Sequence, residues 1–197
     1  YAMPRGALRS ELIACLRQSR KSRRPRARGA DRRGTIPNMT SIHDRPAEVA
    51  ERLVPGHWEG DLIKGARNAS AIGTLVERAS LFVTLAKMEN ASAEAAVAGF
   101  CSVLARIDAQ RRLSLTYDQG REMAQHARLT EMTQVRVYFA DPHSPWQRGI
   151  NENTNGLLRQ YFPKGADLSG FSQDQLDAVA WQLNTRPRKS LNWLCPA

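Results

Sequence analysis

The chain has 197 residues, enough for one substantial core and an appendage of some tens of residues. Its 29 Lys and Arg against 19 Asp and Glu give a formal charge of +10. Three distant cysteines without CxxC spacing argue against a disulfide framework or a structural zinc site and for a reducing compartment. No apolar run approaches the roughly 18 residues of a membrane span, and no signal peptide is visible, so we expect no membrane partner.

The positive charge is concentrated near the N-terminus. Nine basic residues lie between Arg17 and Arg33 against Asp31 alone, which leaves the rest of the chain nearly neutral. A basic arm joined to a nearly neutral globule predicts a polyanionic partner, with nucleic acid as the first candidate. The alternative is a solvated linker that is basic for solubility. The basic arm residues that we expect to contact nucleic acid are Arg20, Lys21, Arg23 and Arg24.

The first part of the chain shows little sign of a packed core. Residues 6–17 carry apolar side chains at helical spacing, which fits either the end of a preceding helical domain or a free amphipathic helix. Residues 34–55 contain three prolines and predict a linker with one short helix near Ala47–Leu53. We therefore divide the chain into a basic arm and linker at 1–55 and a core at 56–197. The chain does not begin with Met, and we expect it to be a fragment of something longer.

The predicted core begins with three strands. The segments His57–Ile63, Ala69–Val76 and Leu81–Lys87 are short and lie between turn residues, which predicts an antiparallel meander. The apolar stripe of Ser92–Ile107 predicts a helix. The elements expected after it are a strand at Arg112–Tyr117, a helix at Glu122–Thr133, a strand at Gln134–Phe139, a helix from Ile150 and a helix after the capping box Ser172–Gln175. This order predicts an α/β fold, a mixed five-stranded sheet with helices on both faces.

The segment before and within the helix expected from Ile150 stands out. Two prolines and a glycine make Asp141–Gly149 a loop. In the helix that follows, Glu152, Asn155 and Arg159 share the polar face. Only one carboxylate therefore stands in the first turn, near a glycine-hinged loop and on the same face as a basic residue.

Three carboxylates stand where ligand sites of α/β sheets concentrate. Asp61 lies on the first strand, Asp118 follows the fourth, and Glu152 opens the late helix. Such carboxylates raise each other's pKa unless a cation compensates them. Hard divalent ions prefer oxygen ligands, and two of them about 3.5–4 Å apart promote phosphoryl transfer.

Each of these carboxylates also has an ordinary interpretation. Asp118 fits a turn, Glu152 fits a first-turn charge favoured by the helix dipole, and Glu59 could take the place of Asp61. Because the three carboxylates occur in one chain together with the basic arm, we favour the metal site.

Three blocks of the sequence resemble one known family. Gly56–Asp61, Thr116–Gly120 and Phe139–Gly165 are similar to the motifs of bacterial insertion-sequence transposases, closest to insertion-sequence family thirty. The spacing from Asp118 to Glu152 matches the family's second-to-third acidic spacing. The resemblance extends from about Ser41 to the end, and it implies a ribonuclease H-like fold, the integrase catalytic core.

The resemblance also implies a chemistry. It implies a DDE triad of Asp61, Asp118 and Glu152 that binds Mg²⁺ or Mn²⁺, expected as two ions, and that cleaves DNA and transfers a strand through a 3′-hydroxyl. The implied partners are transposon ends and target DNA, bound by a homo-oligomer in the bacterial cytoplasm in association with the nucleoid. Family members carry an N-terminal helix-turn-helix region, of which Tyr1–Arg33 would be a remnant.

Several residues around the expected late helix are candidates for DNA contact. Those residues are Arg148, Asn155, Arg159 and Lys164. Lys164 fits a solvent-facing residue equally well. Trp146 either stacks on bases or anchors the loop by packing, and we expect Trp58 and Trp181 in the core. Two other functions stay open: a nuclease of the same fold that cuts without joining, and a non-catalytic nucleic-acid-binding fragment.

Overall fold

The computed structural model describes residues 7–8, 11–12 and 36–197. The chain divides into two compact units, Tyr1–Arg33 and Gly34–Ala197. In the first unit only the four helical residues at 7–8 and 11–12 are described, so most of the helix considered at 6–17 and all four basic arm residues lie outside the described part. The second unit holds the predicted core.

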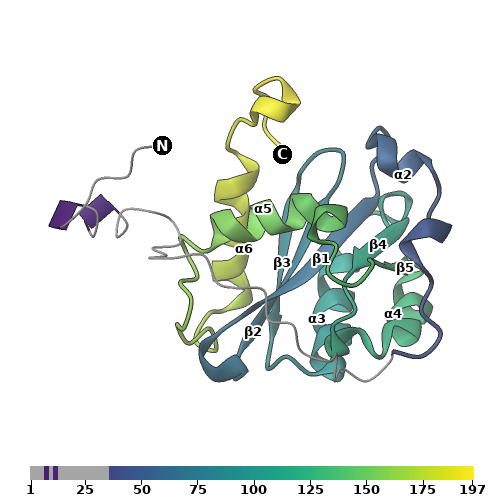
Figure 1. Cartoon of the computed structure of the whole chain (residues 1–197), viewed down its shortest axis with the longest axis horizontal. Helices are drawn as coiled ribbons and strands as arrows, with labels where there is room; N and C mark the ends of the chain where they lie inside the picture. Colours follow the sequence, from purple (N-terminus) through teal and green to yellow (C-terminus); the bar gives the residue numbers. More distant parts are fainter. Residues whose placement is uncertain (1–6, 9–10, 13–35) are drawn as a thin grey trace. The chain divides into compact units, whose positions relative to one another are not determined.

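A five-stranded sheet forms the centre of the second unit (Figure 1). The strands are β1 (His57–Lys64), β2 (Ala71–Glu77), β3 (Val83–Met88), β4 (Ser114–Tyr117) and β5 (Arg136–Phe139). Their order is β3-β2-β1-β4-β5, with β1, β2 and β3 antiparallel and β4 and β5 added in parallel to β1. The antiparallel meander and the mixed five-stranded sheet are both confirmed.

Helices cover both faces of the sheet, as predicted (Figure 1). The α-helices are α2 (Glu48–Glu51), α3 (Ala93–Leu104), α4 (His126–Thr133), α5 (Gly149–Leu158) and α6 (Gln173–Asn184). The short 3₁₀ turns are η1 (Ile42–Asp44), η2 (Ala66–Asn68), η3 (Ala109–Arg111), η4 (Arg121–Met123), η5 (Pro145–Arg148) and η6 (Lys189–Leu191). Within the described residues, no helix has both the length and the apolar character that crossing a bilayer requires.

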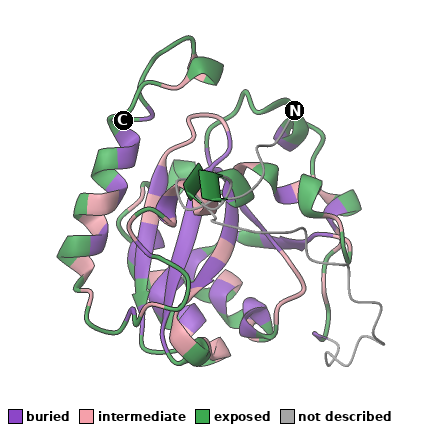
Figure 2. Ribbon diagram, turned by 60° about the vertical axis from the view of Figure 1, so that its left-hand side comes forward, coloured by how far each residue is buried: buried purple, intermediate pink, exposed green. Residues whose placement is uncertain are grey.

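Two apolar layers hold the helices on the sheet. One layer packs α3 and α4 against it through residues such as Leu75, Phe100 and Leu129, and the other packs α5 and α6 through residues such as Leu158 and Leu183. All seven residues of β2 are buried, because helices lie on both of its faces. Figure 2 shows these buried strands between helices whose outer faces are exposed.

The segment 36–55 packs with the core. Ile36 and Ile42 are buried, Val49 is completely so, and Ser41 forms a β-bridge with Phe139. The compact unit accordingly begins at Gly34, well before the start expected at Gly56.

Candidate active site

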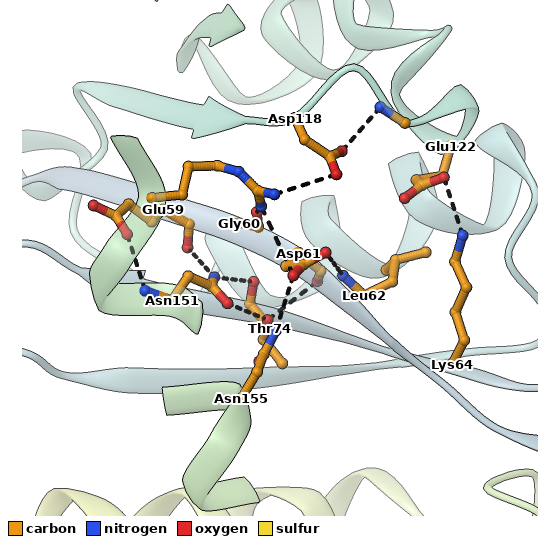
Figure 3. Close-up of polar contacts among 12 residues, drawn as sticks. Glu59, Gly60, Asp61, Leu62, Lys64, Thr74, Asp118, Glu122, Asn151 and Asn155 are labelled. Carbon is orange, nitrogen blue, oxygen red and sulfur yellow. Dashed lines mark hydrogen bonds and ion pairs between the residues drawn. The ribbon is translucent and has the colours of Figure 1, made fainter. Parts of the chain in front are cut away.

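Two of the predicted carboxylates come from neighbouring parallel strands. Asp61 lies on β1, and Asp118 directly follows β4, which pairs with β1 in parallel. The Leu62 N–H donates to Asp61 Oδ1 at 2.8 Å, and the Gly120 N–H donates to Asp118 Oδ1 at 2.9 Å. These backbone hydrogen bonds orient both carboxylates beside the end of β4, as Figure 3 shows.

The guanidinium of Arg148 lies between these two carboxylates. Its Nη2 donates to Asp118 Oδ2 at 3.2 Å, and its Nη1 lies 3.8 Å from Asp61 Oδ2. Nη1 also donates to the carbonyl of Gly60 at 2.9 Å, and Arg148 is only 7% exposed. A cation thus already stands where two like charges converge. Arg148 was a candidate for contact with DNA bases, and in this structure its side chain points inward instead.

The carboxylate of Asp61 is partly desolvated, with Arg148 and Asp118 nearby. Burial raises the pKa of Asp61 to about 6, although the nearby charge of Arg148 lowers it, and the charge of Asp118 raises it further. The amide of Asn155 donates to Asp61 Oδ2 at 3.0 Å and so fixes the orientation of the carboxylate. A desolvated carboxylate beside a second one favours a bound cation.

Glu152 does not join this pair. It lies in the first turn of α5, as predicted, but its side chain is exposed. Among the described residues, no group of three or more His, Cys, Asp or Glu side chains is arranged to hold one metal ion. The structure thus brings Asp61 and Asp118 together and leaves Glu152 apart.

Glu122 is a further carboxylate near the site that the sequence did not single out. It lies in η4, is 7% exposed, and pairs with Lys64 through a 3.5 Å contact between Oε2 and Nζ (Figure 3). A methyl group on Gly120 would stand 2.5 Å from Glu122 Oε1 and 2.8 Å from Asp118 Oδ1. The turn after β4 therefore needs glycine to accommodate both carboxylates. The position of Glu122, four residues after Asp118, was the available signal, but we assigned this residue only to the start of the helix expected at Glu122–Thr133.

A buried polar network fixes the start of α5 beside Glu152. The Asn151 N–H donates to Glu59 Oε2 at 2.9 Å, and Asn151 Nδ2 donates to the Glu59 carbonyl at 2.8 Å. The hydroxyl of Thr74 donates to Asn151 Oδ1 at 3.1 Å. Glu59 is fully buried and paired with Arg78. Glu59 thus anchors α5 to the centre of the sheet, and its two carboxylate oxygens are bound by Arg78 and the Asn151 N–H.

The other DNA-contact candidates have mixed positions. Arg159 is half-buried, and its Nη1 donates to the Phe162 carbonyl at 3.3 Å, whereas Lys164 is exposed. Trp146 is 73% exposed, so it does not anchor its loop by packing. Trp181 is 60% exposed and its expected place in the core was wrong, because α6 turns the face with Leu176, Ala180 and Leu183 inward.

Comparison with known proteins adds the family to this geometry. Residues 51–145 match the Integrase core domain. The chain is 66% identical over 196 residues to the transposase for insertion sequence element IS1086 of Cupriavidus metallidurans, covering 100% of this chain and 58% of the relative. It is 44% identical over 201 residues to transposase InsI for insertion sequence element IS30A of Escherichia coli, covering 100% of this chain and 52% of the relative.

A solved structure supports the fold. One chain of the cryo-EM structure of the simian T-cell lymphotropic virus intasome in complex with the PP2A regulatory subunit B56 gamma matches with a TM-score of 0.53 and 22% identity. The match covers 67% of this chain and 49% of that chain, and it bears on the fold alone. This chain spans about half the length of the curated relatives it matches. The chain is thus similar over its whole length to insertion-sequence transposases of the IS30 type, and its integrase core domain is built on a ribonuclease H-like sheet.

Proposed function

We propose that this protein is a DNA transposase that cleaves DNA and transfers strands with divalent metal ions. The observation that carries the proposal is the convergence of Asp61 and Asp118 on the Arg148 guanidinium, where β4 ends beside β1 in an integrase-type sheet. Relatives that cover the whole chain are named transposases for insertion sequences, which supports the same reaction. The proposed substrates are transposon ends and target DNA, bound by a homo-oligomer.

The pair of carboxylates fits a hard divalent cation. Asp61 and Asp118 offer oxygen donors, which Mg²⁺ and Mn²⁺ prefer, and the place between them suits a positive charge, since Arg148 occupies it. We propose that these two residues hold the ion and that Glu152 supplies the further carboxylate of a DDE triad and of a second ion. Bound divalent ions would activate a water or 3′-hydroxyl and offset the charge of the leaving oxygen.

Arg148 has two roles in this proposal. In this structure its guanidinium keeps the charges of Asp61 and Asp118 from repelling each other. Asp61 and Asp118 would hold a divalent ion through oxygens that face Arg148 here, so the guanidinium would leave them when such an ion is bound. Arg148 would then be available for a DNA phosphate or base, the contact predicted from its place in the loop before α5.

The remaining residues of the site position these groups. Asn155 holds Oδ2 of Asp61, so its amide keeps that carboxylate oriented whichever cation is bound. The buried hydrogen bonds between Asn151 and Glu59 fix the turn of α5 that carries Glu152. Arg159 and Lys164, at the far end of α5, are proposed to bind phosphates of the DNA strand.

Nicking of supercoiled DNA in the presence of Mg²⁺ tests the proposal. We expect Asp118→Asn to lower the nicking rate by about 100-fold or more, since removal of one such electrostatic contact costs at least that much in comparable sites. Asp167→Asn, which changes an exposed carboxylate after α5, is the matched control. Undiminished nicking by Asp118→Asn would remove this residue from the mechanism. A substrate with a free 3′-hydroxyl then measures joining, which separates a transposase from a nuclease.

A further inference from the structure

A basic groove lies next to the first turns of α5. It has a volume of about 740 Å³, and it lies between α5, the turn η6, Leu81 and the residue that follows α2. We define this basic groove by five of the polar residues that line it: Arg52, Asn153, Arg188, Lys189 and Ser190. None of the residues that line it is acidic.

The three cations of the groove make no direct ion pair with the described residues, although burial raises the pKa of Glu59 and the charge of Arg52 lowers it. Within that part of the chain, none of the ion pairs involves Arg52, Arg188 or Lys189. The guanidinium of Arg188 is held in place by a hydrogen bond from Nη2 to the Leu183 carbonyl at 3.0 Å. Its Nε is buried and makes no hydrogen bond to a described residue, which leaves a fixed donor unsatisfied.

The environment of Arg188 favours a negatively charged ligand. Burial lowers the pKa of Arg188, and the positive charge of Arg186 lowers it further. Neutral hydrogen-bonding groups, the amide of Asn153 and the hydroxyl of Ser190, lie beside the three cations. Guanidinium and ammonium groups next to amide and hydroxyl groups form a typical site for phosphate oxygens.

The groove lies beside the turns of α5 that carry Glu152. Gly149, Ile150 and Asn153 of α5 line it, and Glu152 lies on the same two turns of the helix. The positive N-terminal end of α5 adds to the attraction for an anion. A polynucleotide at the proposed catalytic residues would thus find a second basic contact one helix face away.

We propose that the basic groove binds the phosphodiester backbone of a DNA strand at a site separate from Asp61 and Asp118. This inference rests on the proposed function for the choice of DNA as the polyanion. The groove makes no contact with base edges in this proposal, so it contributes affinity that does not depend on sequence.

The test compares the salt dependence of binding to a short DNA duplex of fixed sequence. The groove variant Arg52→Gln/Arg188→Gln/Lys189→Gln is compared with Lys87→Gln/Arg128→Gln/Arg136→Gln, which removes three exposed charges that do not line the groove. We expect the slope of log affinity against log salt to fall by about 0.9 for each phosphate that the protein no longer neutralises, roughly two to three for the groove variant. The control variant should change the slope by less than about 0.9.

Because Arg188 also bonds the Leu183 carbonyl, Arg52→Gln/Lys189→Gln serves as a second variant that keeps this hydrogen bond. Equal slopes for the groove and control variants, or an unchanged slope in both groove variants, would overturn the proposal. Inorganic phosphate at matched ionic strength is a second probe. If the groove variants lose phosphate binding but keep their affinity for DNA, the proposal is also overturned. The groove would then bind isolated phosphate ions and not DNA.

Nicking by the unmodified protein separates this inference from the proposed function. If the unmodified protein nicks DNA and the groove variants bind DNA normally, only the proposal that the groove binds DNA is refuted. If the unmodified protein does not nick DNA but the groove variants still reduce the salt dependence of DNA binding, the transposase reaction is refuted. The groove then remains a DNA-binding site.

Discussion

Replacing Asp61 by Asn should stabilise the metal-free protein above pH 6. The side chain of Asp61 is only 25% exposed, and burial raises its pKa from 3.8 to about 6. A shift of about two pKa units corresponds to about 3 kcal/mol, at about 1.4 kcal/mol per unit. The folded protein at neutral pH thus keeps a charged group that is more stable in water, which is common for residues retained for function.

The pH dependence distinguishes this effect from ordinary packing changes. The folded state holds the proton of Asp61 more tightly than the unfolded state, so the contribution of this group to stability is complete below pH 3.8. That contribution is lost as the pH rises through about 6. The Asn variant does not titrate, so its advantage over the unmodified protein should be near zero at low pH and approach about 3 kcal/mol above pH 7.

Urea unfolding in EDTA at a series of pH values measures the difference. Asp141→Asn is the control with the opposite sign, because a hydrogen bond from Gln147 lowers the pKa of Asp141. Its stabilising contribution exists above the ordinary pKa and disappears as the pH falls, so this variant should lose stability only at the higher pH values. A difference between Asp61→Asn and the unmodified protein that does not change with pH would refute the reasoning.

Three further predictions concern the packing, the sheet and the arm. Glu59→Ala should lower the free energy of unfolding by about 3–5 kcal/mol, because it leaves Arg78 buried and unpaired, and a loss below about 1 kcal/mol in urea titrations would contradict the buried pair. Gly73→Ala, whose methyl group would stand 2.4 Å from the nearest side-chain carbon, should cost about 1–3 kcal/mol. The matched Gly156→Ala in the open interior of α5 should stabilise by about 0.5–1 kcal/mol, so equal melting temperatures for these two variants would be inconsistent with the packing. Changing the four basic arm residues to Gln should flatten the salt dependence of DNA binding, and an unchanged slope would show that the arm does not touch phosphates.

Much of the fold follows from local patterns in the sequence. The short strand segments with tight connections predicted the antiparallel β1, β2 and β3, and the apolar stripe of α3 predicted its face toward the sheet. The capping box at Ser172 marked the start of α6 within one residue. Asp61 and Asp118 are close because β4 ends beside the middle of β1, a relation that strand order and register fix together.

The parts that could not be predicted depend on contacts between distant residues. Nothing near Arg148 in the sequence indicates that its side chain turns inward to the carboxylates, because its partners lie on β1 and after β4. The same holds for the hydrogen bonds of Asn151 to Glu59, which join α5 to a strand far away in the sequence. Trp181 was misplaced because a large aromatic side chain was given more weight than its position on the outer face of α6.

The positions of Mn²⁺ ions in crystals of this protein, located by their anomalous scattering, test the central claim most directly. We expect an ion bound by carboxylate oxygens of Asp61 and Asp118, with the guanidinium of Arg148 moved away and the Glu152 carboxylate turned to the metal. A structure at saturating Mn²⁺ in which Arg148 still bridges Asp61 and Asp118, with no ion on either carboxylate, would contradict it.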